Sequence, residues 1–477
     1  MRAGVVWATM LRPITSRVCL GGDRSAGLRG AWRVRTSCDF SVSLRGGAVP
    51  SPAPTNGSMG ACPSKPKPKV VVIAGPTAVG KTALGVALAL QCGGEVIAAD
   101  SATVYRGMDV GTAKPTAEER QGVPHHLMDV VDPWDGEMDA ADWLDRAEAL
   151  IEDIAGRGKV PVVVGGAHFY LTWLCQGRPR TPPSNPDVRD RISRELQGDG
   201  SWAESLERLR RVDAEAAEKL TQNDYFRLAR KLEIVELSGR SNSSFLPEQS
   251  WESPHDLRCY VLDMPHRRAQ LYQRIDWRCE KMVMDSTGPN LLTECVALAG
   301  KLEASGFDEG IREARGRSIW VEKIVGYKQG LYFLRKIAEA KRRGGAATVG
   351  AESFRTFLWE FQAASRNLAQ MQLKSFRKQS VWRWMDAKDG TQRLLGAIAE
   401  ELELDAEAFR AAREDPAYLA EQVKMRRSSD GLQKQMREYG DKIYRLRWFH
   451  GNTARGRQRS DAAAALADRL ADALAAL

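Results

Sequence analysis

The chain has 477 residues, a formal net charge of +9 and 43% hydrophobic residues. That length is enough for about two or three domains, and the hydrophobic content allows a sizeable core. The basic balance suits a polyanionic partner. No stretch has the ~20 uninterrupted apolar residues that a membrane span needs, so we expect no membrane partner. The eight cysteines form no C-x-x-C pair, which predicts a reducing compartment and no structural zinc.

Residues 1–64 differ in composition from the rest of the chain. They hold eight Arg, two Asp and neither Lys nor Glu, a net charge of +6, and they end in a Pro-containing segment. An Arg- and Ser-rich, acid-poor leader of this kind predicts an organellar transit peptide, and therefore a plastid or mitochondrial location. The alternatives are a disordered extension or a true start at Met59, either of which would leave the protein in the cytoplasm.

A Gly-rich loop, G-P-T-A-V-G-K-T, occupies residues 75–82 directly after the apolar run Val70–Ala74. A strand before such a loop and an Ala/Leu-rich helix after it predict a phosphate-binding loop, in which backbone N–H groups and the helix N-terminus converge on one anion. The candidate ligands of the phosphate are Gly75, Pro76, Thr77, Ala78, Val79, Gly80, Lys81 and Thr82. The Thr82 hydroxyl is also the candidate Mg²⁺ ligand. The loop alone leaves open a kinase, a nucleic-acid motor and a transferase that releases pyrophosphate.

Alternating strand and helix patterns continue through residues 65–175. A second strand is expected at 95–98 and a buried strand at 160–164. Between them, apolar positions recur at helical spacing from Asp139, the expected N-cap, to Gly156, the expected stop. This βαβ alternation predicts an α/β fold whose core is a parallel sheet, with the site at the C-terminal ends of the strands.

The later part of the chain is mainly helical in pattern. Residues 176–258 are charged and helical between a Pro-rich segment and a polar loop, which predicts an inserted helical domain. Residues 259–400 are expected to continue the core, with helices over 311–385. Residues 401–477 are expected to form a helical, basic C-terminal extension whose last, Ala-rich helix packs on a surface that the sequence does not identify.

Four motifs stand in order with consistent spacing. They are G-P-T-x-x-G-K-T at 75–82, D-S-x-x-x-Y-x-G-M-D-x-G-T-A-K-P at 100–115, P-H-H-L-x-D at 124–129 and V-V-G-G at 163–166. In these motifs the chain resembles the tRNA dimethylallyltransferase (isopentenyltransferase) family. Further similar pieces lie at 223–230, 273–278 and 324–329, and the run at 361–369 most resembles a plant and algal branch.

The resemblance implies transfer of a dimethylallyl group from dimethylallyl diphosphate to N6 of the adenosine immediately 3′ of a tRNA anticodon (position 37). The phosphate loop then holds diphosphate, and Mg²⁺ is the implied cofactor. Asp100 matches the family's catalytic aspartate, which accepts a proton from the adenine amine, while Thr77 and Arg278 match positions beside the leaving group. The implied partners are dimethylallyl diphosphate and the tRNA anticodon stem-loop, and the enzyme is expected to be a monomer.

The resemblance also supplies candidate tRNA contacts in the core and in the inserted domain. They are Asp100, Ser101, Ala102, Thr103, Ala167, Arg189, Phe226, Arg227, Arg230, Lys323, Tyr327 and Lys328. The family's insertion grips the anticodon stem, and the target base is extruded into the cleft. The mixed charges of the insertion are also typical of an ordinary solvated helix face.

Two departures from the family pattern bear on tRNA binding. Ala167 stands where relatives carry Thr, which removes a hydroxyl. Gln370-Met371-Gln372 stands where relatives carry Lys-Arg-Gln, which removes two cations near an expected phosphate contact. Weaker or altered tRNA binding is the expected consequence, with nearby cations available to compensate.

Alternative interpretations remain open for several residues and for the function. Asp100 could serve only as a partner of Lys81 or Mg²⁺, and Arg278 could be a solvated helix residue. His125 and His126 suggest a metal at first sight, but adjacent histidines point apart and no third ligand lies at suitable spacing. For the function, the alternatives are a small-molecule kinase, an adenylate-type isopentenyltransferase that makes cytokinin from free AMP, ADP or ATP, and a catalytically weakened tRNA-binding relative.

Overall fold

The computed structural model describes residues 67–134, 137–196, 201–245, 253–284, 288–304, 323–343, 350–427, 461–462 and 464–472. The transit-peptide prediction for residues 1–64 lies outside them, and so do residues 428–460 of the predicted basic C-terminal extension. Both stay predictions. No helix among the described residues is both long enough and apolar enough to cross a membrane.

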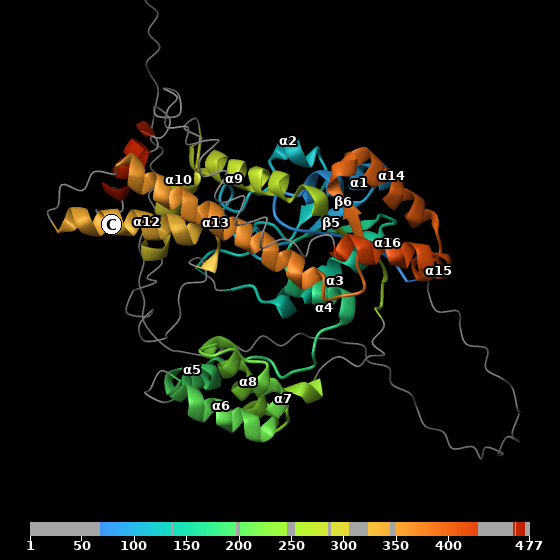
Figure 1. Ribbon diagram of the computed structural model, residues 1–477, viewed down its shortest axis with the longest axis horizontal. Coiled ribbons are helices and arrows are strands. Elements are labelled where there is room, and N and C mark those ends of the chain that lie inside the picture. The colour runs from blue at the N-terminus through green and yellow to red at the C-terminus, as the bar shows by residue number, and fades with distance from the viewer. Residues whose placement is uncertain are drawn as a thin grey trace, which may run out of the picture. The chain divides into compact units, whose positions relative to one another are not determined.

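A six-stranded parallel sheet forms the centre of the core (Figure 1). The strands are β1 (Lys69–Ala74), β2 (Glu95–Ala99), β3 (His125–His126), β4 (Pro161–Gly165), β5 (Asp256–Asp263) and β6 (Arg383–Asp386), in the spatial order β3-β2-β4-β1-β5-β6. Every neighbouring pair is parallel. The fold class predicted from the sequence, a parallel-sheet α/β core, is confirmed.

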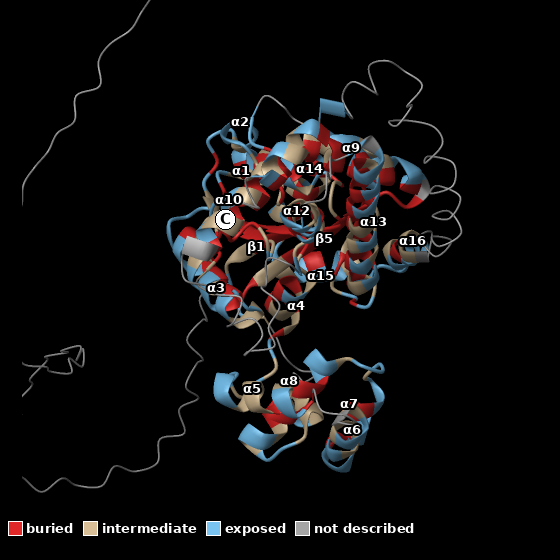
Figure 2. Ribbon diagram, turned by 90° about the vertical axis from the view of Figure 1, so that its left-hand side faces the viewer, coloured by how far each residue is buried: buried red, intermediate tan, exposed pale blue. Residues whose placement is uncertain are grey.

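The central strands are apolar because helices cover both faces of a parallel sheet. Residues Val70 to Ala74 of β1 are completely buried, and so are Val162 and Val163 of β4. In Figure 2 the strands β1 and β5 are red, the colour of buried residues. Since the carboxyl ends of β1, β2 and β4 lie at one edge, the loops that follow them meet there.

Three helices connect the first four strands, and a fourth follows β4. The connecting helices are α1 (Lys81–Cys92), α2 (Ala117–Arg120) and α3 (Ala140–Gly156), and the helix after β4 is α4 (His168–Gln176). Helix α3 begins as predicted, because the Asp139 carboxylate accepts hydrogen bonds from the N–H groups of Ala141 and Asp142. It buries Trp143, whose indole N–H donates to Ala98 O at 2.9 Å.

The inserted segment forms a hydrophobic cluster of its own. Its elements are α5 (Pro186–Glu195), α6 (Ser201–Val212), α7 (Ala214–Glu218), α8 (Tyr225–Ser238) and the short 3-10 helix η1 (Asn242–Phe245). Ile192, Leu209, Leu228 and Leu232 are buried in that cluster. The helical character predicted for the insertion is therefore correct.

The second half of the core is built from longer helices. They are η2 (Pro265–Arg267), α9 (Arg268–Met284), α10 (Leu291–Ala304), α12 (Tyr327–Arg342), α13 (Ala351–Phe376), η4 (Ala387–Asp389), α14 (Gly390–Glu403), α15 (Ala406–Glu414) and α16 (Pro416–Arg427). Helix α13 packs along α9, where Arg366 forms an ion pair with Asp276. Its buried residues lie along one side and its exposed residues along the other (Figure 2).

Two strands were not predicted in this half. β5 lies beside β1 at the centre of the sheet, and the boundary predicted between residues 258 and 259 falls inside it. β6 interrupts the region predicted to be helical up to residue 385. Both predictions were wrong because charged residues interrupt the apolar pattern of these strands, Arg258 in β5 and Arg383 in β6.

The last described helical segment, residues 464–472, packs against the core. Ala464, Ala467 and Ala471 are buried in the main hydrophobic cluster. Lys341 Nζ on α12 forms ion pairs with Asp468 at 2.9 Å and Asp472 at 2.6 Å. The surface on which this helix packs is therefore part of the same chain.

Candidate active site

The phosphate-binding loop lies between β1 and α1 and depends on glycine at two positions. Gly75 has φ of 148°, and a Cβ there would lie 2.6 Å from Leu262 O on β5. Gly80 has φ of 109° and is the N-cap of α1. Because α1 begins at Lys81 without a side-chain cap, the N–H groups of its first turn are left to bind an anion.

Lys81 carries its ammonium into the site. Its Nζ donates a hydrogen bond to Pro76 O at 2.8 Å, so the side chain folds back over its own loop. Burial lowers the pKa of Lys81 to about 8, Asp100 opposes this change, and Arg278 adds to it. Since Asp100 offsets only part of the effect of burial, a negatively charged ligand beside the Lys81 ammonium would stabilise its charged form.

A cavity of about 170 Å³ lies beside this loop. Its lining brings together Thr77, Lys81 and Thr82 from the phosphate loop, Asp100, Ala102 and Thr103 after β2, and Arg278 and Cys279 on α9. Residues 111–113, Pro115 and the helix α13 supply further lining, together with Val164 and Gly165 of β4. Residues almost 300 positions apart in the sequence therefore share one site.

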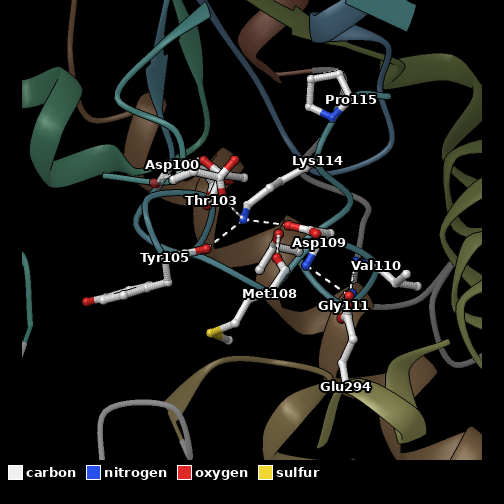
Figure 3. Close-up of polar contacts among 12 residues, drawn as sticks. Asp100, Thr103, Tyr105, Met108, Asp109, Val110, Gly111, Lys114, Pro115 and Glu294 are labelled. Atoms are coloured by element: carbon white, nitrogen blue, oxygen red, sulfur yellow. Dashed lines mark hydrogen bonds and ion pairs between the residues drawn. The ribbon is translucent and has the colours of Figure 1, made fainter. Parts of the chain in front are cut away.

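Asp100 follows the last residue of β2 and is partly exposed. Its Oδ1 accepts a hydrogen bond from Ala102 N at 2.9 Å, which leaves its other oxygen without a partner among the described residues. Figure 3 shows Asp100 beside Thr103. The carboxylate interacts electrostatically with both Lys81 and Arg278, so one anionic and two cationic groups face a common space.

Arg278 lies on α9 and lines the cavity instead of pointing to bulk solvent. Burial lowers the pKa of its guanidinium, and the nearby Cys279 and Asp100 oppose this effect. Among the described residues no hydrogen bond engages its side chain. Thr77, Asp100 and Arg278, the residues predicted to be catalytic, therefore line one cavity, and their catalytic role stays a prediction.

Gln372 is a contributor that the sequence analysis did not assign to the site. Its Oε1 accepts from Thr77 N at 2.9 Å, and its Nε2 donates to Gly166 O at 3.1 Å. The buried amide therefore joins the phosphate loop to the loop after β4. The only signal in the sequence was that Gln372 keeps the last residue of the family's Lys-Arg-Gln triplet. The neighbouring Met371 is 61% exposed.

The candidate tRNA contacts of the core fall into two groups. Ala102 and Thr103 line the cavity, and Ser101 and Lys328 are exposed. Tyr327, in contrast, is completely buried, and its hydroxyl donates to Glu294 Oε2 at 2.6 Å. The prediction that Tyr327 contacts tRNA does not agree with this burial, so its role is internal.

Ala167 is the N-cap of α4 and provides no side-chain hydrogen bond to the helix. The Thr that relatives carry at this position is a residue type that caps helices, so its loss affects α4 as well as any RNA contact.

The candidate contacts of the insertion differ in availability. Phe226 is 64% exposed, and the Arg189 guanidinium lies 4.8 Å from its ring centroid. Lys323 Nζ lies 5.7 Å from the same ring. Arg227 pairs with Asp224 at 3.2 Å but remains largely exposed. Arg230 donates to Glu233 and to Pro182 O, so its guanidinium stabilises the insertion and the prediction that it binds phosphate is not supported.

The two adjacent histidines have separate partners. His126 Nε2 lies 2.8 Å from Glu95 Oε2, and the same carboxylate accepts from Arg157 and Lys159. His125 Nδ1 lies 2.8 Å from Val123 O, and its ring lines the cavity. Burial lowers the pKa of His125, which favours the neutral form of the ring. The described residues contain no group of three His, Cys, Asp or Glu side chains arranged to hold a metal ion.

Comparison with known proteins gives the family. The family model described as IPP transferase matches residues 103–379. The chain belongs to the IPP transferase family. The tRNA dimethylallyltransferase of Protochlamydia amoebophila is 36% identical over 332 residues, which cover 68% of this chain and 85% of the relative. The tRNA dimethylallyltransferase 9 of Arabidopsis thaliana is 33% identical over 374 residues, 72% of this chain and 76% of the relative.

A solved structure agrees with this membership at the level of the fold. A eukaryotic dimethylallyltransferase acting on tRNA is 24% identical, has a TM-score of 0.54 and covers 80% of this IPP transferase and all of the solved chain. The order of motifs in the sequence had predicted the family correctly.

Proposed function

We propose that this IPP transferase moves a dimethylallyl group from dimethylallyl diphosphate to N6 of the adenosine immediately 3′ of a tRNA anticodon. The observation that carries the proposal is the meeting of Asp100, Lys81 and Arg278 on one cavity beside a phosphate-binding loop. This arrangement offers cationic groups for a leaving diphosphate and a carboxylate for an attacking amine. The names of the relatives support the same reaction.

The phosphate loop is the proposed diphosphate site. N–H groups of the loop and of the first turn of α1 would bind the phosphate oxygens, while Lys81 and Arg278 stabilise the charge that develops as the allylic C–O bond breaks. In the free protein the Lys81 ammonium donates a hydrogen bond to Pro76 O, a neutral acceptor. When diphosphate binds, its charged oxygens would replace that carbonyl as the acceptor.

The residues present fit a bound Mg²⁺. Thr82 lies at the start of α1, exposed, and lines the cavity, where its hydroxyl could contribute one ligand. Mg²⁺ at such sites takes most of its remaining ligands from phosphate oxygens and water, so a cage of protein carboxylates is not required. When bound, the ion would supply Lewis-acid stabilisation of the leaving diphosphate.

Asp100 is the proposed acceptor of the amine proton. During transfer a bond forms between N6 of adenosine and the allylic carbon, the C–O bond to diphosphate breaks, and one N6 proton passes to the carboxylate. An adenine amine is a poor nucleophile, so a carboxylate that binds its proton during attack lowers the barrier. The free Asp100 oxygen is the atom available for this hydrogen bond.

The proposed RNA partner is the anticodon stem-loop. Support comes from the exposed Phe226 and the neighbouring Arg189, an aromatic and cationic pair suited to stacking on a base or lying against the backbone. A base that reaches the cavity must leave its stack, and this costs least in a single-stranded loop.

The test is incorporation of labelled dimethylallyl diphosphate into unmodified tRNA, with free AMP run in parallel. We expect labelled tRNA from the wild type and a loss of roughly 10²-fold or more in kcat for Asp100→Asn, with near-normal tRNA binding. Label only in AMP would assign the adenylate-type reaction instead. Unlabelled tRNA that still binds would indicate a non-catalytic relative.

A further inference from the structure

The wall of the cavity contains a segment with no regular secondary structure. Residues 109–113 lie between β2 and α2, outside any helix or strand, and Gly111, Thr112 and Ala113 contribute directly to the lining. Because no helix or strand fixes this segment, its position depends on contacts made by its backbone.

A single buried carboxylate supplies most of those contacts (Figure 3). Glu294 Oε1 on α10 accepts from Asp109 N at 3.0 Å and from Val110 N at 2.7 Å. Its Oε2 accepts from Gly111 N at 2.9 Å and from the Tyr327 hydroxyl at 2.6 Å. Four donors therefore converge on one side chain that is 9% exposed, and hydrogen bonds to an ionised acceptor are about twice as strong as neutral ones.

Packing and a second charge cluster hold the same segment. A Cβ at Gly111 would lie 2.5 Å from Cε2 of Tyr327, so the backbone rests directly on the ring. At the other end, Lys114 Nζ donates to Tyr105 O at 2.6 Å and pairs with Asp109 at 2.8 Å and Asp129 at 2.5 Å (Figure 3). Neither Glu294 nor Lys114 lines the cavity. Both can therefore affect the site only by holding residues 109–113 in position.

We propose that Glu294 is a positioning residue of the transfer reaction, which fixes the 109–113 wall of the cavity with Tyr327 as its support. The expected effect of Glu294 on the reaction rate rests on the proposed function. The hydrogen bonds between Glu294 and residues 109–111 do not depend on that function. The wall determines how the two reacting groups are aligned, and misplacement by about 1 Å is enough to cost roughly 10²-fold in rate. The phosphate loop lies on other elements, so its affinity for anions should be unaffected.

The test combines amide hydrogen exchange with kinetics on the full chain. Glu294→Gln keeps the size of the side chain but turns two donors toward the N–H groups of residues 109–111. We expect faster exchange at those three amides, a decrease in kcat of about 10- to 100-fold, and a Kd for inorganic pyrophosphate within about 2-fold of the wild type. The matched control is Glu118→Gln, an exposed glutamate outside the cavity, which should leave all three values unchanged.

The outcomes separate the inference from the proposed function. If the wild type transfers no prenyl group, the proposed function fails, while the exchange measurement still shows whether Glu294 holds the wall. Unchanged exchange and unchanged kcat in Glu294→Gln would overturn the inference. If that variant does not fold, Tyr327→Phe is measured in its place, because it removes one of the four donors to Glu294. Faster amide exchange at residues 109–111 with a kcat loss of about 2- to 5-fold would support the inference. Exchange and kcat equal to those of the wild type would refute it.

Discussion

At the residue scale, the ionisation of Lys81 links the local structure to the pH dependence of substrate capture. Burial holds the pKa of Lys81 near 8 in the free protein, so the ammonium is charged below that pH and neutral above it. Binding a diphosphate restores a partner for the charge and raises the pKa again, so capture of the substrate is coupled to protonation.

We therefore expect kcat/KM for dimethylallyl diphosphate to decrease by up to about tenfold per pH unit above pH 8. Lys81→Met should lower kcat/KM strongly and remove this dependence, whereas Lys424→Met, at an exposed site, should retain it. The measurement is kcat/KM between pH 6.5 and 9.5 at constant ionic strength. A wild-type profile that stays level through pH 9 would contradict the assignment.

At the scale of single elements, the N-terminus of α4 has a missing cap. Ala167 occupies the N-cap with extended backbone angles, φ −74° and ψ 95°, and provides no oxygen to the free N–H groups of the first turn. We expect Ala167→Thr to raise the free energy of unfolding by about 1 kcal/mol, because the hydroxyl can accept from those N–H groups. Thermal and urea unfolding would measure the change.

The matched control is Ala167→Val, which has the shape of Thr but no hydroxyl. If Val stabilises the protein as much as Thr does, the gain comes from packing and the capping explanation is wrong. Comparing tRNA binding by the same two variants would show whether the hydroxyl also contacts RNA.

The elements also show where sequence reasoning succeeds and where it stops. β1, β2, α3 and β4 could be predicted because each shows the periodicity or the cap of its own type. β5 could not, because Arg258 breaks its apolar pattern. That charge is tolerated in the buried strand because Arg258 pairs with Asp256 and donates to Glu401 O and Leu404 O, and the last two partners are more than 140 residues away.

The candidate site divides in the same way. Thr77, Lys81 and Asp100 could be located from motifs, since a loop and a strand end place them locally. Gln372 and Glu294 could not, because they act by accepting hydrogen bonds from backbone groups of segments almost 200 or more residues away. A helix pattern predicts that such a side chain exists, but only the packing of α10 and α13 shows which N–H groups it meets.

At the scale of the whole molecule, the α9–α13 interface contains a buried acid that couples folding to pH. Glu280 is 4% exposed, and one of its oxygens accepts from Gln362 Nε2 at 3.1 Å. Burial, with Asp276 nearby, raises the pKa of Glu280 from 4.5 to about 8. The folded protein therefore holds a proton that the unfolded chain releases above pH 4.5, so the contribution of this group to stability is complete below pH 4.5 and is lost as the pH rises to 8.

Glu280→Gln should remove that dependence, because the amide keeps the size and the hydrogen-bonding capacity of the acid without ionising. We expect the variant to be as stable as the wild type near pH 5 and more stable by up to a few kcal/mol at pH 8. Glu360→Gln, an exposed change on α13, provides the control and should follow the wild type throughout. Urea unfolding at four pH values measures the difference. A gap between wild type and Glu280→Gln that does not widen from pH 5 to pH 8 would mean that Glu280 is ionised in the folded protein, and that the interface between the two long helices accommodates its charge.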